Sequence, residues 1–567
     1  MVPALAVAAV IGVTLFIGLR GVAAMRTTSD FLVASRRVTP LLNAGAVSGE
    51  YLSAASFLGV AGVMLKDGMG ALWYPVGFTA GYILMLVLVA APMRRSGALT
   101  VPDFAEARLA SPPLRKLAAV VVLVIGALYL VPQFRTAGLV LTVVSGTPYW
   151  FGVTVAGAAV AATLALGGMR AATYVQAFQF VLKLLLFIIP AVWLLASVGE
   201  DVRHRALNPE EFTHFERDTT VTFRVDATLE PGGFVPAGPR MEFPAGAQVP
   251  HVVGSTPPGG VEWQLPLLDF GHSGYPLLGT LAVLVATSLG TMGLPHVIMR
   301  FHTSPDGRAA RRTAAITVGL LGVFYLFPGI YGVLGRVLVP HLYLSGATDT
   351  AVVAMPLQVD SGWRGTLFTT LLTAGAFAAF LATSLGLLLA VSGAIAHDLS
   401  PGGLGRLRVT VLAAAAVVVV LALFAAHLDA GLLVTWGFTV AASTFSPLLV
   451  LGIWWPRLTA PGAICGVAAG LLSSSGAIAV TLFGPPLPGV LAILVTQPAM
   501  WTVPLAAVTM VLVSLRGRPP AWAMTAMLRL HLDEAREPMF QPRRGNRSAW
   551  SSRRWWTVRR MLRRSGR

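Results

Sequence analysis

The feature that most restricts the fold of this chain is a series of apolar segments about as long as a bilayer is thick. A helix of about 20 residues crosses about 30 Å of hydrocarbon. Thirteen segments meet this length, at roughly 3–24, 43–64, 71–93, 117–145, 150–169, 171–198, 276–299, 313–338, 365–396, 409–427, 430–454, 460–483 and 489–514. The sequence therefore predicts an all-α, polytopic protein that crosses the cell membrane many times.

Composition agrees with this class of protein and excludes several others. Only 11% of the 567 residues are charged, whereas soluble domains have about 25%. The one cysteine, Cys465, allows no internal disulfide and no CxxC metal or redox site. The spans contain no HExxH motif, no GxSxG motif and no carboxylates paired at helical spacing, so we do not expect an enzyme.

Most of the net charge of +17 lies in the C-terminal tail, 515–567. Fourteen arginines there face only Asp533, Glu534 and Glu537, and the tail also contains Trp555 and Trp556. Arginine pairs beside tryptophan after a last span suit contact with anionic lipid headgroups. A plain solvated tail is the alternative, and nucleic acid is not an expected partner.

The positive charge of the connections alternates along the chain, which predicts how the spans are oriented. Arginine-rich connections are cytoplasmic by the positive-inside rule, and one of them follows the span at 276–299 with Arg300, Arg308, Arg311 and Arg312. The pattern places the N-terminus outside and the C-terminus in the cytoplasm. Residues 1–24 lack a basic leader region, so we interpret them as a first span and not as a signal peptide.

One connection, 199–275, is long, polar and rich in proline and glycine. Its segment TTVTFRVDATL alternates apolar and polar residues, as strands do. We expect an extracellular, partly β-structured insertion, which is either a lid over a vestibule or inert decoration.

The stretch from Asn43 to Met64 is unusual for a span because it contains Glu50 and four glycines. A carboxylate at membrane depth costs several kcal/mol or more, so Glu50 is a candidate functional residue. Glycines and serines permit a helix that breaks and exposes its carbonyls to a polar cavity. The alternative is that the small residues only allow close helix packing.

Four further spans contain signals of a site. Proline at 295 blocks a helical hydrogen bond beside Gly290, Gly293 and His296, so a break is expected there. In 365–396, hydroxyl and carbonyl oxygens near Thr383 are ligands that a small alkali cation accepts. Other polar side chains within spans are either packing and snorkelling residues or site residues; they are Gln133, Arg135, Gln176, Gln179 and Lys183.

Four motifs together resemble the sodium:solute symporter family, and most of all its cation/acetate (monocarboxylate) permease branch. They are GEYLSAASFLG, LWYPVGFTAGY, GTMGLPHVIMRFHTSPDGRAARRTAAITVG and SGAIAHDL. The resemblance runs from about Ser29 to about Thr459 and leaves out the insertion and the tail. It implies a leucine-transporter-type fold of two five-helix inverted repeats, 43–198 and 276–454, with the first helix of each repeat broken. The span at 1–24 and the two at 460–514 are then peripheral.

The resemblance also implies a site. A sodium ion would take the carbonyls of Gly49, Leu52 and Ala379 and the side chains at 382 and 383. This chain has Ala382 and Thr383 where many relatives have two hydroxyls, with Ser384 next in the chain. Proton coupling through Glu50 is therefore a rival to sodium coupling. We expect no other cofactor or metal.

For the substrate, the resemblance and the broken helices together point to a short-chain monocarboxylate such as acetate, propionate or pyruvate. The candidate contacts are Glu50, Tyr51, Ser53, Gln133, Gly290, Gly293 and His296. The predicted function is cation-coupled symport by alternating access. The alternatives are a sodium symporter for proline, pantothenate or a sugar, and a solute sensor that does not transport.

Overall fold

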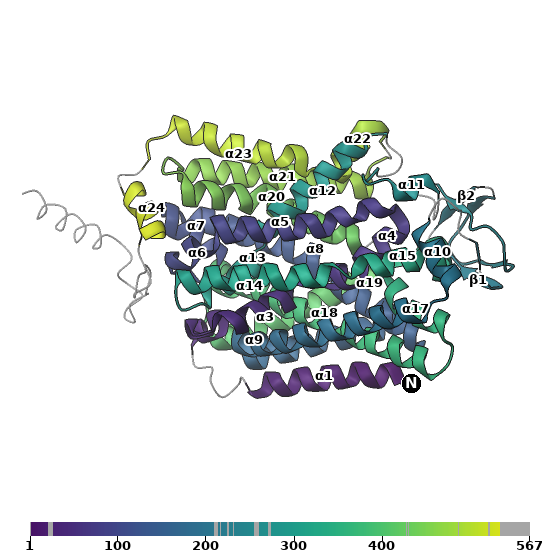
Figure 1. Cartoon of the computed structure of the whole chain (residues 1–567). Helices are drawn as coiled ribbons and strands as arrows, with labels where there is room; N and C mark the ends of the chain where they lie inside the picture. Colours follow the sequence, from purple (N-terminus) through teal and green to yellow (C-terminus); the bar gives the residue numbers. More distant parts are fainter. Residues whose placement is uncertain are drawn as a thin grey trace, which may run out of the picture.

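The computed structural model describes residues 2–20, 27–208, 214–215, 217–223, 226–230, 232–253, 260–269, 274–426, 428, 430–485, 487–519 and 522–532. The helices form a bundle with roughly aligned axes (Figure 1). Helix α1 begins at the same end of the bundle as the strands, and α24 lies at the opposite end (Figure 1). The predicted lipid-binding part of the tail, beyond Leu532, lies outside the described residues.

The N-terminal half contains helices up to the insertion. They are α1 (Val2–Arg20), α2 (Thr28–Val33), η2 (Ala34–Arg36), α3 (Pro40–Tyr51), the π-helix η3 (Ala55–Gly59), α4 (Val60–Asp67), η4 (Met69–Leu72), α5 (Trp73–Leu88), α6 (Ala90–Ser96), α7 (Val101–Leu109), α8 (Pro112–Ser145), α9 (Tyr149–Ser197) and α10 (Glu200–Leu207).

The C-terminal half contains the remaining helices. They are α11 (Val261–Gln264), α12 (Pro276–Gly293), α13 (Pro295–His302), α14 (Gly307–Tyr325), α15 (Pro328–Leu338), α16 (His341–Ser345), η6 (Thr348–Thr350), α17 (Ala351–Val359), α18 (Trp363–Gly393), the π-helix η7 (Ala394–Leu399), α19 (Leu404–Phe424), α20 (Ala430–Trp454), α21 (Ala460–Phe483), α22 (Gly489–Thr496), α23 (Ala499–Arg516) and α24 (Ala523–Leu532).

Within the described ranges, 11 helices are long and apolar enough to cross a membrane, or 12 if the bent pair at 40–67 is one span. The central helix is α18, whose most apolar window is completely buried. Element α9 has 49 residues and consists of two helices in succession. It is interrupted at Gly168, whose φ of 53° and ψ of −154° are not helical. A glycine tolerates this positive φ, and it lies where the sequence predicts two spans to meet, at 150–169 and 171–198.

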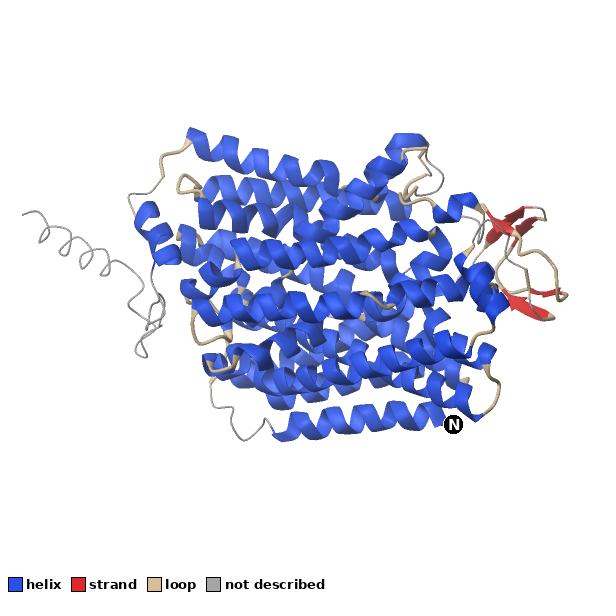
Figure 2. Cartoon of the chain, viewed as in Figure 1, coloured by secondary structure: helices blue, strands red, loops and turns tan. Residues whose placement is uncertain are grey.

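The strands predicted in the insertion are present, at the end of the bundle where the chain begins (Figure 2). Strand β1 (Thr219–Thr222) pairs with β4 (Arg240–Phe243), and β2 (Ala227–Glu230) lies between β3 (Gly233–Val235) and β5 (His251–Val252), all antiparallel. The Arg217 guanidinium donates to the Gln358 carbonyl at 3.0 Å, so the insertion is bound to the end of α17.

Both predicted helix breaks are confirmed. Helix α3 ends at Tyr51, and the chain continues after Leu52 and Ser53 with a bend of 64° between its two halves. Helix α12 ends at Gly293, Leu294 is extended, and Pro295 begins α13. Proline is favoured in the first turn because the amide it lacks would be unpaired there.

Candidate functional site

The break after α3 leaves the backbone carbonyls of Gly49 and Glu50 without a helical partner. The Ser53 amide donates to the Tyr51 carbonyl at 2.7 Å and so does not reach Gly49. The Ala54 amide donates to Gln133 Oε1 at 3.0 Å and so does not reach Glu50. Buried carbonyls need hydrogen-bond donors, and side chains from two other helices supply them.

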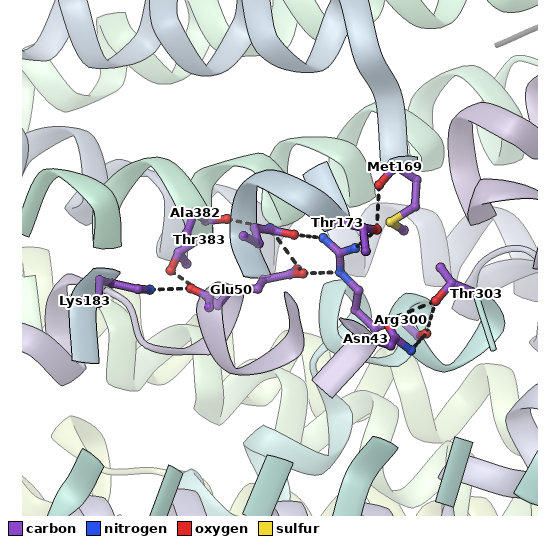
Figure 3. A network of polar contacts seen from close by, with 11 residues as sticks. Asn43, Glu50, Met169, Thr173, Lys183, Arg300, Thr303, Ala382 and Thr383 are labelled. Atoms are coloured by element: carbon purple, nitrogen blue, oxygen red, sulfur yellow. Dashed lines mark hydrogen bonds and ion pairs between the residues drawn. The ribbon is translucent and has the colours of Figure 1, made fainter. Parts of the chain in front are cut away.

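One of these donors is a buried lysine. Lys183 Nζ, from α9, lies 2.5 Å from the Gly49 carbonyl oxygen and 2.7 Å from that of Leu52. The other is Thr383 on α18, whose hydroxyl donates to the Glu50 carbonyl at 2.5 Å. Lys183 and Thr383 are both fully buried, and they approach the break from different helices (Figure 3).

A buried ion pair lies beside this group. Arg300 Nε on α13 is 2.5 Å from Glu50 Oε2, and Arg300 Nη1 donates to Thr173 Oγ1 at 2.9 Å. Gln176 on α9 accepts from Arg300 and donates through Nε2 to the Ala382 carbonyl at 2.6 Å. The dashed lines of Figure 3 trace this network from the break of α3 to α13.

The placement of Arg300 corrects the sequence analysis. The sequence pattern predicts a cytoplasmic connection at this position, but Arg300 is buried inside α13. The carboxylate of Glu50 provides the reason, because a charge at this depth is stabilised by a hydrogen-bonded partner of opposite sign. A carboxylate within a span needs a positively charged partner, so Glu50 was the sequence signal that could have identified Arg300.

Two glycines make room for this arrangement. A Cβ at Gly386 on α18 would lie 1.7 Å from Glu50 Oε1. A Cβ at Gly49 would lie 2.1 Å from the Gln176 carbonyl oxygen, so α3 and α9 meet backbone to backbone. Gly49 thus allows close packing of α3 on α9, and its carbonyl is also one of those exposed at the break. Close packing and a broken helix are both present at this glycine.

The residues predicted to bind a cation are only partly brought together. Gly49, Leu52 and Thr383 surround the break, but an ammonium group contacts the first two. The Ala382 carbonyl accepts from Gln176. Ala379 and Ser384 are buried in α18, and the Ser384 hydroxyl has no hydrogen-bond partner among the described residues.

Several predicted substrate contacts lie together beside the break after α3. Gln133 Oε1 accepts a hydrogen bond from the Ala54 amide. The Nε2 of the same side chain is buried and has no partner in the described part of the chain. The Tyr129 hydroxyl donates to Ser53 Oγ at 3.2 Å. The Tyr129 ring also lies 5.6 Å from the ring of His296, centroid to centroid.

Other predicted contacts have structural partners. The Tyr51 hydroxyl is 2.7 Å from Thr291 Oγ1 and joins α3 to α12. A Cβ at Gly290 or at Gly293 would lie 2.5 or 2.7 Å from a carbonyl oxygen of α20, so these two glycines serve packing. Arg135 pairs with Asp349 at 3.2 Å, and Gln179 donates to Thr14 at 2.9 Å.

The sequence matches the model of the sodium:solute symporter family over residues 31–226 and 275–470, more than half of the chain. The chain belongs to the sodium:solute symporter family. It is a multi-pass membrane protein and a transporter by family, not an enzyme.

Two curated relatives cover most of the chain. The symporter YwcA of Bacillus subtilis (strain 168) is 29% identical over 477 residues, which cover 82% of this chain and 83% of the relative. A monocarboxylic acid transporter of Corynebacterium glutamicum is 29% identical over 479 residues, which cover 82% of this chain and 80% of the relative.

Solved structures show the same fold. A Na+-coupled sialic acid symporter matches with a TM-score of 0.66 at 13% identity, over 92% of this chain and 98% of that one. The transporter MhsT, solved with L-phenylalanine, matches with a TM-score of 0.50 at 15% identity, over 84% of this chain and 98% of that one. These neighbours have the leucine-transporter fold, as the sequence predicts for this chain.

Proposed function

We propose that this symporter carries a short-chain monocarboxylate, such as acetate, propionate or pyruvate, together with a cation by alternating access. The observation that carries the proposal is Gln133 Nε2, which lies beside the break at Leu52–Ser53 and has no hydrogen-bond partner among the described residues. An amide donor next to the start of a half-helix suits a carboxylate, because the half-helix end also has partial positive charge. The similarity to a monocarboxylic acid transporter supports the same substrate class.

The proposed architecture has thirteen spans, with the N-terminus outside and the C-terminus in the cytoplasm. Dividing α9 at Gly168 and joining the bent pair at 40–67 supports this number. The repeats are 43–198 and 276–454, with the insertion at 199–275 outside. The start of α1 at the strand end of the bundle, with α24 at the other end, supports this orientation (Figure 1).

The substrate class is tested by counterflow, which needs no ion gradient. The purified full-length chain is reconstituted in liposomes loaded with unlabelled pyruvate, and entry of labelled pyruvate is followed. Pyruvate is a stronger acid than acetate, so less of it crosses the bilayer as the neutral acid; protein-free liposomes measure that leak.

We expect labelled pyruvate to exchange, with acetate and propionate as competitors. Exchange of proline, pantothenate or glucose in place of monocarboxylates would overturn the proposed substrate class. Saturable pyruvate binding without exchange would instead identify a sensor.

A further inference from the structure

The insertion contains one large side chain that is almost completely buried. Trp263, in α11, is 1% exposed, although its neighbours Glu262 and Gln264 are both exposed. Its ring packs in a small apolar cluster with Met64 of α4 and Ala71 of η4. A buried indole contributes a large apolar contact area, so this part of the insertion is attached to the helix bundle.

The backbone around Trp263 also lies very close to the helices. A Cβ at Gly68 would lie 2.5 Å from the Trp263 carbonyl oxygen. A Cβ at Gly70 would lie 2.9 Å from the Leu267 carbonyl carbon. The absence of a side chain at both glycines is what allows the backbone of the insertion to approach the end of α4 and η4.

The same segment reaches both broken helices. Figure 1 shows α11, α4 and α15 at the end of the bundle that carries the strands. Trp263 packs against α4, which belongs to the second half of the first broken helix. The Leu268 amide donates to Thr280 Oγ1 at 2.9 Å, on α12, which is the first half of the second broken helix. Between them, Trp73 Nε1 at the start of α5 donates to the Pro266 carbonyl at 2.6 Å.

We propose that residues 262–268 are a strap that holds this end of the bundle closed, and that Trp263 leaves its cluster when the end opens. Alternating access requires the two sides of a transport site to open in turn. Helices α4 and α12 cannot separate without breaking the contacts of the strap. The inference goes beyond the proposed function, because it concerns access to the break and not the substrate, and it favours a lid over inert decoration.

A buried arginine holds the indole ring in the closed position. The Arg336 Cζ atom, on α15, lies 5.2 Å from the centre of the Trp263 ring, and both side chains are 1% exposed. A guanidinium is attracted to the face of an indole, and the attraction is stronger where water is excluded. Arg336 Nη2 also donates to the Arg205 carbonyl in α10, so this contact joins the strap to two further helices.

One feature of the closed position favours release. Trp263 Nε1 is buried and has no hydrogen-bond partner among the described residues. A buried indole N–H usually has a partner, and an unpaired donor costs free energy that is recovered when it reaches water. Packing and the Arg336 contact stabilise the closed position, while the unpaired N–H lowers the cost of leaving it.

The strands of the insertion are anchored elsewhere, so the strap can move while they stay in place. The Arg217 guanidinium donates to the Gln358 carbonyl of α17 at 3.0 Å. The Val252 amide donates to the Tyr343 hydroxyl of α16 at 3.0 Å. Neither α16 nor α17 is part of a broken helix.

The test measures access to the break and needs no substrate. Cys465 is the one native thiol, so Ser53→Cys in a Cys465→Ala background places a single reporter where Ser53 is completely buried. The rate at which a charged maleimide labels the purified full-length protein in nanodiscs reports opening. We expect Trp263→Ala to raise this rate by at least about tenfold. The matched control Phe234→Ala removes an exposed ring on β3 of the same insertion and should leave the rate unchanged.

A second variant displaces the strap without changing its sequence. Gly70→Ala adds a Cβ 2.9 Å from the Leu267 carbonyl carbon and should also raise the labelling rate. Gly329→Ala on α15 is its control, because the added Cβ would lie 3.9 Å from Leu72 Cδ2, an ordinary contact. We expect labelling of this control at the rate of the parent protein.

An unchanged labelling rate in a folded Trp263→Ala protein would overturn the proposal. An equal rise in Phe234→Ala would overturn it too, because the whole insertion and not the strap would then control access. Melting temperature and elution on size exclusion establish folding, and Gly70→Ala decides the question if Trp263→Ala does not fold. Failure of the pyruvate counterflow would overturn the proposed substrate and leave this measurement valid.

Discussion

Arg300 Nε lies 2.5 Å from Glu50 Oε2, and each side chain is only 1% exposed. This contact joins α3 to α13, one half of each broken helix. Asn43 Nδ2 adds a hydrogen bond to the Arg300 carbonyl at 2.9 Å. Helices α3 and α13 are therefore bound together on one side of the breaks (Figure 3).

Glu50→Gln should destabilise the protein strongly, because it leaves the Arg300 guanidinium buried without its counter-charge. Breaking one side of a buried ion pair costs about 3–5 kcal/mol. The melting temperature in detergent measures the effect. The double variant Glu50→Gln/Arg300→Met should recover part of the loss, since no unpaired charge remains; an unchanged melting temperature in the single variant would show that the pair contributes little.

Gly386→Ala should displace the Glu50 carboxylate, because the added Cβ would lie 1.7 Å from Oε1. Overpacking of this kind costs about 1–3 kcal/mol or more. Gly319→Ala is the matched control, since its Cβ on α14 meets nothing within 4 Å. We expect a lower melting temperature and slower counterflow for the first variant only, and equal behaviour of both would contradict the close contact.

Thr383→Ala should slow transport by several-fold, because it removes the donor to the Glu50 carbonyl at the break. A hydrogen bond of this kind contributes about 0.5–1.5 kcal/mol, and more when the remaining partner is buried. Thr383→Ser keeps the hydroxyl and should restore the rate of counterflow. Failure of serine to do so would show that the methyl group, not the hydroxyl, is what matters.

Gln133→Glu should weaken binding of a carboxylate substrate. Glutamate keeps an oxygen acceptor for the Ala54 amide but replaces the unpartnered Nε2 donor with an oxygen that repels an anion. We expect at least a tenfold rise in the pyruvate concentration that half-saturates counterflow, equivalent to about 1.4 kcal/mol. An unchanged value would place the substrate away from Gln133.

The sequence predicts the broken helices well because their causes are local. Proline at 295 blocks a helical hydrogen bond wherever the helix packs, and the small residues around Glu50 permit a break. The same local reasoning identifies Glu50, Gln133 and Thr383 as unusual for a span.

The partners of these residues depend on contacts between distant segments. Lys183 is 131 residues from Leu52 in sequence, and Arg300 is 250 residues from Glu50. From the sequence, Lys183 could equally be a snorkelling residue, and Arg300 lies at the end of an apolar segment like many loop arginines. Only the packing of α9 and α13 against α3 shows where their charges lie.

The most direct measurement is pyruvate accumulation in proteoliposomes under an imposed cation gradient, either of protons, with an acidic exterior, or of sodium. The account predicts accumulation above the protein-free leak under one of these two gradients, and an ionophore for that cation should abolish it. Absence of accumulation under both gradients, with a protein that is folded, would contradict the account.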